Sequence, residues 1–164
     1  MRISFTVPGD PHGKERPRVA FRGGKAHAFT PKTTHEYEKR VRLFAGRALA
    51  GLGFTPVDCP VRAQITARYD WPKKYLDYDP EGSHLKQPKP GTKLADEIKA
   101  MRYGHILPKK PDADNIAKSI LDALNGLMYA DDAQVFSLQV VKRWRDPETE
   151  RFAGVDVVLE WEEQ

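Results

Sequence analysis

Five aspartates stand close together in the segment 109–135, whose sequence is KKPDADNIAKSILDALNGLMYADDAQV. They are Asp112, Asp114, Asp122, Asp131 and Asp132, and Lys118 lies among them. Carboxylates repel one another, so a fold that crowds them needs a cation to hold them together. A hard divalent cation such as Mg²⁺ is the usual partner of several carboxylate oxygens. The segment therefore predicts a metal site, and the basic chain around it makes a phosphate backbone the natural substrate.

The spacing of the aspartates divides their expected roles. Asp112 and Asp114 lie two residues apart before an expected helix, and in an extended segment residues i and i+2 face the same way. Lys118 stands one turn after Asp114 on the same helix face, where it can pair with a carboxylate or contact a phosphate. Asp122 is about 12 Å along the helix axis from Asp114, too far to share an ion whose ligands lie about 2–2.6 Å away. We assign Asp122 to positioning Lys118 or another basic neighbour.

The remaining acids leave alternatives open. Asp131 and Asp132 are adjacent and face opposite sides of an extended chain, so only one of them is expected to join the site. An Asp-x-Asp-Asn run before a helix also serves as a helix cap, and Asn115 with the free amides of the first turn favours a phosphate. An EF-hand loop is a poor fit, because Ile116 and Ala117 occupy the positions that need an oxygen ligand and a glycine.

Positive charge is concentrated in the first third of the chain. The formal net charge is +4, but residues 1–50 alone carry eleven Lys and Arg against four Asp and Glu. We expect 10–32 to be a basic arm that neutralises phosphates. The expected DNA contacts are the cations of the arm and those beside the acidic cluster: Lys14, Arg16, Arg18, Lys32, Lys109 and Lys110.

Targeting signals and membrane segments are not expected. No apolar run approaches the ~20 residues that span a bilayer, and the N-terminus turns polar by Gly9, unlike a signal peptide. Cys59 is alone, which excludes an internal disulfide and suits a reducing compartment. The sequence predicts a cytoplasmic protein without a membrane association.

A chain of 164 residues is expected to be one domain spanning 1–164. Apolar periodicity predicts strands at 3–7, 61–71, 135–144 and 152–161. A first helix is expected from Thr33, with a Thr33/Glu36 capping box, to Gly51. A second helix is expected from the N-cap Asp114 to Asn125-Gly126. The last two strands are expected to form an antiparallel hairpin. The order β-α-β-α-β-β predicts an α+β (mixed α/β) layer, with two helices packed on one mixed sheet.

Two segments depart from this regular order. Within the basic arm, 19–21 and 26–29 are expected to be short extended pieces around Gly23-Gly24. The Pro-, Gly- and Lys-rich segment 72–110 is a long excursion from the core, with helical periodicity only at 93–101. Connections of this length are usually functional.

Three motifs of the acidic segment resemble the signature of the RusA family of Holliday junction resolvases. They are Lys110-Pro-Asp-Ala-Asp-Asn-Ile-Ala-Lys118, Asp122-Ala-Leu-Asn-Gly126 and Asp131-Asp-Ala-Gln-Val135. In the arm, Pro8-Gly9, Lys14, Arg16-Pro-Arg18 and Thr30-Pro-Lys32 are similar to phage and prophage members. The order of strands and helices is similar across nearly the whole chain, and 72–110 is the main departure.

The resemblance implies a crossover junction endodeoxyribonuclease, a homodimer that depends on Mg²⁺ or Mn²⁺. Such an enzyme resolves four-way junctions by paired nicks in DNA recombination and repair. The resemblance implies a metal site of Asp112, Asp114 and Asp132 and a catalytic Lys118, and it leaves Asn115, Asp122 and Asp131 in supporting roles. Two alternatives remain open: a junction- or DNA-binding protein that does not cleave, and a metal-dependent nuclease for other branched DNA.

Overall fold

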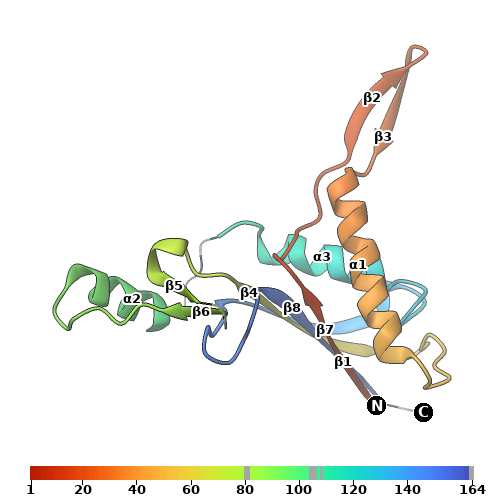
Figure 1. Cartoon of the computed structure of the whole chain (residues 1–164). Helices are drawn as coiled ribbons and strands as arrows, with labels where there is room; N and C mark the ends of the chain where they lie inside the picture. The colour runs from red at the N-terminus through yellow and green to blue at the C-terminus, as the bar shows by residue number, and fades with distance from the viewer. Residues whose placement is uncertain (80–81, 104–106, 108, 163–164) are drawn as a thin grey trace.

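A computed structural model of the chain describes residues 1–79, 82–103, 107 and 109–162. Its centre is a four-stranded sheet in the order β1-β8-β4-β7 (Figure 1). Strand β8 pairs antiparallel with β1 and with β4, whereas β4 pairs parallel with β7. The expected α+β class with a mixed sheet is therefore confirmed. The strands are β1 (Arg2–Pro8), β4 (Val61–Tyr69), β7 (Val135–Trp144) and β8 (Gly154–Trp161).

The predicted hairpin of 135–144 with 152–161 is wrong, because β4 lies between β7 and β8. Ile65 of β4 is opposite Val157 of β8 on one side and Val140 of β7 on the other. Every second residue of β4, from Val61 to Tyr69, is apolar and almost completely buried. A strand with such a buried face is best placed inside the sheet. The connection from β7 to β8 needs to cross only about 10 Å, which is two strand spacings.

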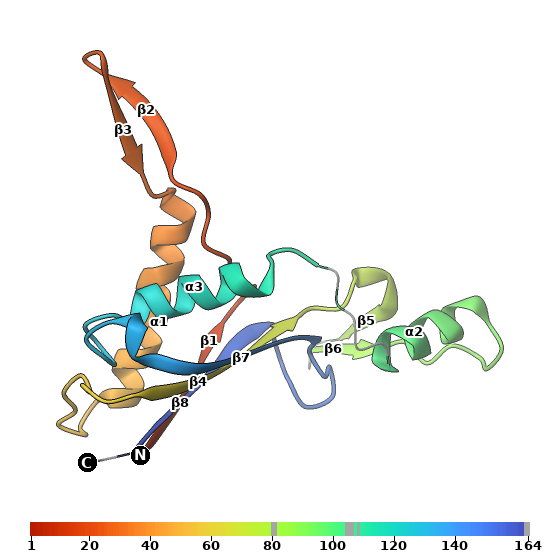
Figure 2. The same cartoon turned by 180° about the vertical axis from the view of Figure 1, so that it is seen from behind.

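Two helices, α1 (Lys32–Leu49) and α3 (Ala113–Leu124), lie on one side of the sheet, as predicted (Figures 1 and 2). Both contribute apolar side chains to the main core, including Val41 of α1 and Ile120 of α3, which have no exposed surface. The helices are also joined by a polar contact. The Arg42 guanidinium donates to the carbonyl oxygens of Ala123, at 2.8 Å, and Asn125, at 3.0 Å. A cation on the last carbonyls of α3 is favoured by the helix dipole.

The helix starts differ from the predicted ones. Helix α1 follows Pro31, and the Thr33 hydroxyl donates to the Glu15 carboxylate, so the predicted Thr33/Glu36 capping box is wrong. In α3 the N-cap residue is Asp112, and Asp114 lies inside the first turn, which corrects the prediction of Asp114 as the cap. The predicted stop at Asn125-Gly126 is confirmed. Gly126 has φ of 68°, a left-handed conformation that favours glycine.

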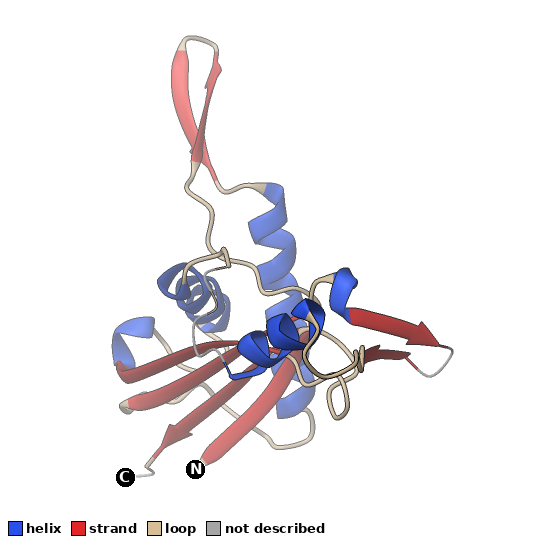
Figure 3. Cartoon of the chain, turned by 90° about the vertical axis from the view of Figure 1, so that its left-hand side faces the viewer, coloured by secondary structure: helices blue, strands red, loops and turns tan. Residues whose placement is uncertain are grey.

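The basic arm contains a hairpin, as the extended pieces around Gly23-Gly24 predicted. Strands β2 (Arg18–Arg22) and β3 (Lys25–Phe29) form a separate two-stranded sheet, called here the β2–β3 ribbon. Its turn residues Gly23 and Gly24 have φ of 58° and 75°, as the tight primed hairpin turns require. Figure 3 shows the ribbon standing off the sheet, beyond the start of α1.

The excursion 72–110 has more structure than the sequence indicated. The predicted helix is present as α2 (Lys93–Tyr103), and a hairpin that was not predicted precedes it. This hairpin consists of β5 (Leu76–Asp79) and β6 (Gly82–Leu85), after the short 3₁₀ helix η1 (Lys73–Tyr75). A second apolar cluster forms here around Trp71, Tyr75 and Leu76. No helix in the described ranges is both long enough and apolar enough to cross a bilayer.

Candidate active site

The start of α3 presents two acids without local partners. Asp112 is the N-cap residue, with an extended φ/ψ of −69°/153°, but its side chain makes no capping hydrogen bond. Asp114 is already helical, so the assumption that both acids lie on one extended segment is wrong. Both side chains are exposed, and neither forms an ion pair or a side-chain hydrogen bond with any residue that the structure describes. Within the described ranges, no cation pairs with either charge.

Lys118 lies four residues after Asp114 on α3, the spacing at which side chains are neighbours on a helix surface. Its side chain is exposed and has no ion pair within the described part of the chain. Its ammonium group is thus available to an anion that approaches the start of α3. The free amides of the first turn favour an anion at the same place.

Asp122 and Lys14 form an ion pair that joins the arm to α3. The Lys14 Nζ lies 2.9 Å from a carboxylate oxygen of Asp122 and also contacts the carboxylate of Glu38 on α1. Partial burial of Lys14 opposes its charge, but the hydrogen bonds and charges of Glu38 and Asp122 raise its pKa above the ordinary value. Asp122 therefore has a basic neighbour, which is Lys14 and not Lys118. The sequence had expected Lys14 to contact DNA, and the structure gives it two protein partners.

Asp131 and Asp132 have different surroundings at the start of the short 3₁₀ helix η2 (Asp132–Gln134). Asp131 is the N-cap residue, and Asp132 is the first residue of the helix. The Asp131 carboxylate accepts a hydrogen bond from the Ala133 amide at 2.8 Å, and the Gln134 side chain accepts one from the Asp131 amide at 3.0 Å. This is a capping box. Burial, followed by the charges of Asp131 and Asp122, raises the pKa of Asp132.

The acids thus divide into two sets. Asp112 and Asp114 lie at the start of α3. In the other set, the charges of Asp131 and of Asp122, near the end of α3, raise the pKa of Asp132. Among the residues described, no three Asp, Glu, His or Cys side chains are close enough to hold a metal ion in this conformation. The donor chemistry nevertheless fits Mg²⁺, because all the donors are carboxylate oxygens. A cation would also relieve the repulsion that acts on Asp132.

The base of the arm packs directly against the start of α3. The Lys14 amide donates to the Asn115 carbonyl oxygen at 2.8 Å. At Gly13, an added Cβ would lie 2.6 Å from Cβ of Pro111 and 3.0 Å from Cβ of Asn115. An open pocket of about 470 Å³ lies between residues 12–15 and 110–115. Sequence reasoning did not identify Gly13, because its neighbours here are about 100 residues away along the chain.

The expected DNA-contacting cations have different local partners. Arg16 and Lys110 have none among the described side chains. Arg18 lies 3.5 Å from Glu15, and Lys32 lies 3.5 Å from Glu36. These two are exposed ion pairs, which contribute little and exchange readily for a phosphate.

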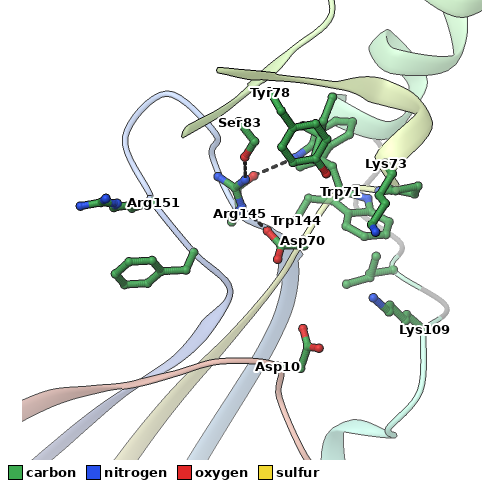
Figure 4. A pocket seen from close by; sticks show the side chains of 14 residues that line it. Asp10, Asp70, Trp71, Lys73, Tyr78, Ser83, Lys109, Trp144, Arg145 and Arg151 are labelled. Atoms are coloured by element: carbon green, nitrogen blue, oxygen red, sulfur yellow. Dashed lines mark hydrogen bonds and ion pairs between the residues drawn. The ribbon is translucent and has the colours of Figure 1, made fainter. Parts of the chain in front are cut away.

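A larger pocket lies where the excursion meets the ends of β4 and β7 (Figure 4). Its volume is about 680 Å³, and Trp71 and Trp144 contribute aromatic surface, with ring centroids 5.8 Å apart. The Lys109 ammonium lies 5.7 Å from the centre of the Trp144 ring, a cation–π geometry. Arg145 fixes this region, because its guanidinium donates to the Glu150 carbonyl oxygen at 2.6 Å and contacts Asp70 and Ser83.

The fold and this site are those expected of a protein that acts on nucleic acid: a mixed sheet, acids and a lysine on one helix, and a cationic arm fixed to it. Comparison with known proteins gives the family. Residues 8–150 match the family described as endodeoxyribonuclease RusA. The chain therefore belongs to the RusA family of endodeoxyribonucleases, which confirms the resemblance drawn from its motifs. It is also similar to the uncharacterized protein YqaN of Bacillus subtilis (strain 168). The two are 33% identical over 141 residues, 85% of this chain and 86% of YqaN.

Proposed function

We propose that this protein is a Mg²⁺-dependent endodeoxyribonuclease that resolves four-way (Holliday) DNA junctions by paired nicks. The family supports a nuclease, and one observation of this structure carries the proposal further. The carboxylates of Asp112 and Asp114 and the ammonium of Lys118 are exposed and unpaired, within the described residues, over the first two turns of α3. Groups that the described part of the chain leaves unpaired are available to a metal ion and a phosphate.

The residues have distinct proposed roles. Asp112, Asp114 and Asp132 would hold the metal. When bound, Mg²⁺ supplies charge neutralisation at the scissile phosphate and lowers the pKa of a water molecule. Lys118 stabilises the negative charge that develops on the phosphate oxygens in the transition state.

The arm and the segment before α3 would hold the flanking DNA. Arg16 and Lys110, which are exposed, contact phosphates and so supply affinity without reading bases. Because the base of the arm packs on α3, phosphates bound by the arm are held at a fixed position relative to Asp112 and Lys118. A four-way junction has approximate two-fold symmetry. We therefore propose a homodimer, in which each subunit nicks one of two opposed strands.

The test compares nicking of synthetic four-way, forked and linear DNA with Mg²⁺ and with EDTA. We expect Mg²⁺-dependent nicks in the four-way junction. Asp112→Asn and Asp114→Asn should abolish nicking while binding, measured by gel shift, stays equal or becomes tighter, because a negative charge facing DNA is removed. Asp96→Asn is the matched control, since Asp96 is an exposed acid in the first turn of α2.

Metal binding is measured separately by calorimetric titration with Mn²⁺. The wild type should bind, and Asp112→Asn should bind more weakly. Wild-type nicking rates in either aspartate variant would refute the metal assignment. A junction that is shifted in the gel but never nicked would favour the binding protein without cleavage, and equal nicking of forks would favour a nuclease for other branched DNA.

A further inference from the structure

The β2–β3 ribbon has two chemically different faces. Alternate residues of a strand point to opposite sides, and in the ribbon Val19 is opposite Ala28 and Phe21 is opposite Ala26. These four side chains form its apolar face. The other face carries the cations Arg18 and Lys25 and the ring of His27, together with Ala20 and Phe29. Residues 18–29 contain no Asp or Glu, so the charge of the ribbon has a single sign.

The apolar face is open to solvent. Phe21 is 79% exposed and Val19 is 59% exposed. The ribbon is a sheet of its own, separate from the core sheet. A lone two-stranded hairpin is only marginally stable in water, and exposing a large aromatic ring at its tip gives the free protein no stability. The apolar face therefore indicates a partner that covers it.

DNA fits both faces of the ribbon better than a second copy of the chain does. A stable protein interface buries about 800 Å² on each partner, far more than one Phe, one Val and two Ala can provide. A two-stranded ribbon enters the major groove, and apolar side chains such as Phe insert between base steps. Residues 18–29 carry cations and no acid, so the ribbon complements a phosphate backbone. The same charges repel the ribbon of another copy of the chain.

The position of the ribbon relates this contact to the candidate active site. The arm leaves α3 at Gly13 and Lys14, which are fixed to Pro111 and Asn115, and the ribbon begins four residues later. We propose that Phe21, supported by Val19, is a wedge that stacks on a base pair exposed at the branch point of DNA. The cationic face contacts the flanking phosphates at the same time. This inference depends on the proposed function, because it needs a branched DNA substrate.

The test measures stacking at the branch point directly. A four-way junction carries 2-aminopurine next to the branch point, and its fluorescence is recorded on binding in EDTA, so that no cleavage is needed. The wild type should increase the fluorescence, and Phe21→Ala should remove the increase. An aromatic–base stack corresponds to about a 5- to 150-fold change, so nicking with Mg²⁺ should fall by a factor in that range. Phe21→Trp should restore both signals.

Phe29→Ala is the matched control, because Phe29 lies at the other end of the ribbon on the opposite face, opposite Arg18. It should keep the wild-type fluorescence. The salt dependence of binding should be the same for Phe21→Ala and the wild type, because no phosphate contact is lost.

Three outcomes overturn the wedge: unchanged fluorescence in Phe21→Ala, no fluorescence increase with the wild type, or dissociation of a DNA-free dimer by Phe21→Ala in sedimentation equilibrium. The last would assign the apolar face to a second copy. If the wild type increases the fluorescence but never nicks, the nuclease proposal fails and the wedge stands. If the wild type nicks and Phe21→Ala behaves identically, only the wedge fails.

Discussion

Replacing Lys14 separates two roles that the sequence and the structure give it. The sequence places Lys14 among the DNA contacts, whereas in the structure its ammonium lies between the carboxylates of Asp122 and Glu38. Lys14→Met keeps the aliphatic stem and removes the charge. If the ion pairs are the main role, the variant should be less stable but should bind DNA with an unchanged number of phosphate contacts.

The size of the effect follows from the burial of the three groups. Their side chains are 22%, 26% and 17% exposed for Lys14, Asp122 and Glu38. Exposed ion pairs contribute about 0.2–1 kcal/mol, and removing one partner of a fully buried pair costs about 3–5 kcal/mol. The intermediate burial here gives about 2 kcal/mol. For a domain of this size that lowers Tm by about 4–8 °C.

A double-mutant cycle tests the pairing by circular dichroism. Lys14→Met leaves two carboxylates facing each other, so adding Asp122→Asn should recover part of the lost stability, a non-additivity typical of residues in contact. DNA binding is tested separately, by the salt dependence of junction binding. Each lost phosphate contact makes the slope of log K against log salt less steep by about 0.9. Lys14→Met should leave the slope unchanged, and Arg16→Met should reduce it by that amount without a change in Tm.

A Lys14→Met variant with a reduced salt slope and an unchanged Tm would contradict the ion-pair role of Lys14. Lys14 would then contact a phosphate, as the sequence predicted, and its contacts with Asp122 and Glu38 would contribute nothing to stability.

Two further substitutions probe the start of α3 and the acid set at its other end. Gly13→Ala places a Cβ against the ring of Pro111 and should lower stability by about 1–3 kcal/mol and slow nicking, measured by thermal unfolding and the junction assay. Gly46→Ala is its control, because nothing lies within 4 Å of the new Cβ in α1 and the helix should gain about 0.5–1 kcal/mol. Asp132→Asn should raise Tm at pH 7 without metal. Burial and the charges of Asp131 and Asp122 raise the pKa of Asp132 above 3.8, so the folded state holds the proton more tightly and ionisation is destabilising. The gain should disappear below pH 3.8, where Asp132 is protonated in both states; a gain that persists there would contradict the charge explanation.

The sequence predicted those features that depend on local pattern. The alternation of Val61, Ala63 and Ile65 identifies a strand with one buried face, and Asn125-Gly126 identifies the end of a helix. Both are confirmed. The order of the strands was not predictable in this way, because 135–144 and 152–161 have similar composition and either could pair with the other. The strand order is determined by β4, which pairs with a strand on each of its two edges.

The same limit applies to the site. The acids and the lysine of α3 share one helix, so their spacing alone related them to one another. The partner of Asp122 lies 108 residues earlier in the chain, and an ion pair over that separation leaves no periodic signal. The predicted start of α3 was also wrong by two residues, because either aspartate of the Asp-x-Asp pattern can stand at the N-cap position.

Lys14 determines which acids of α3 retain an uncompensated charge. Without it, the carboxylates of Asp122 and Glu38 would both lose their cation, and Asp122 already raises the pKa of Asp132. A cation attracted to α3 would then meet an unpaired Asp122 in addition to Asp112 and Asp114. With Lys14 in place, Asp122 is paired within the protein, while Asp112 and Asp114 stay free of partners among the described residues. The same lysine holds the arm against α3 through its amide on Asn115. One residue therefore couples the position of the cationic arm to the end of the helix where negative charge is left available.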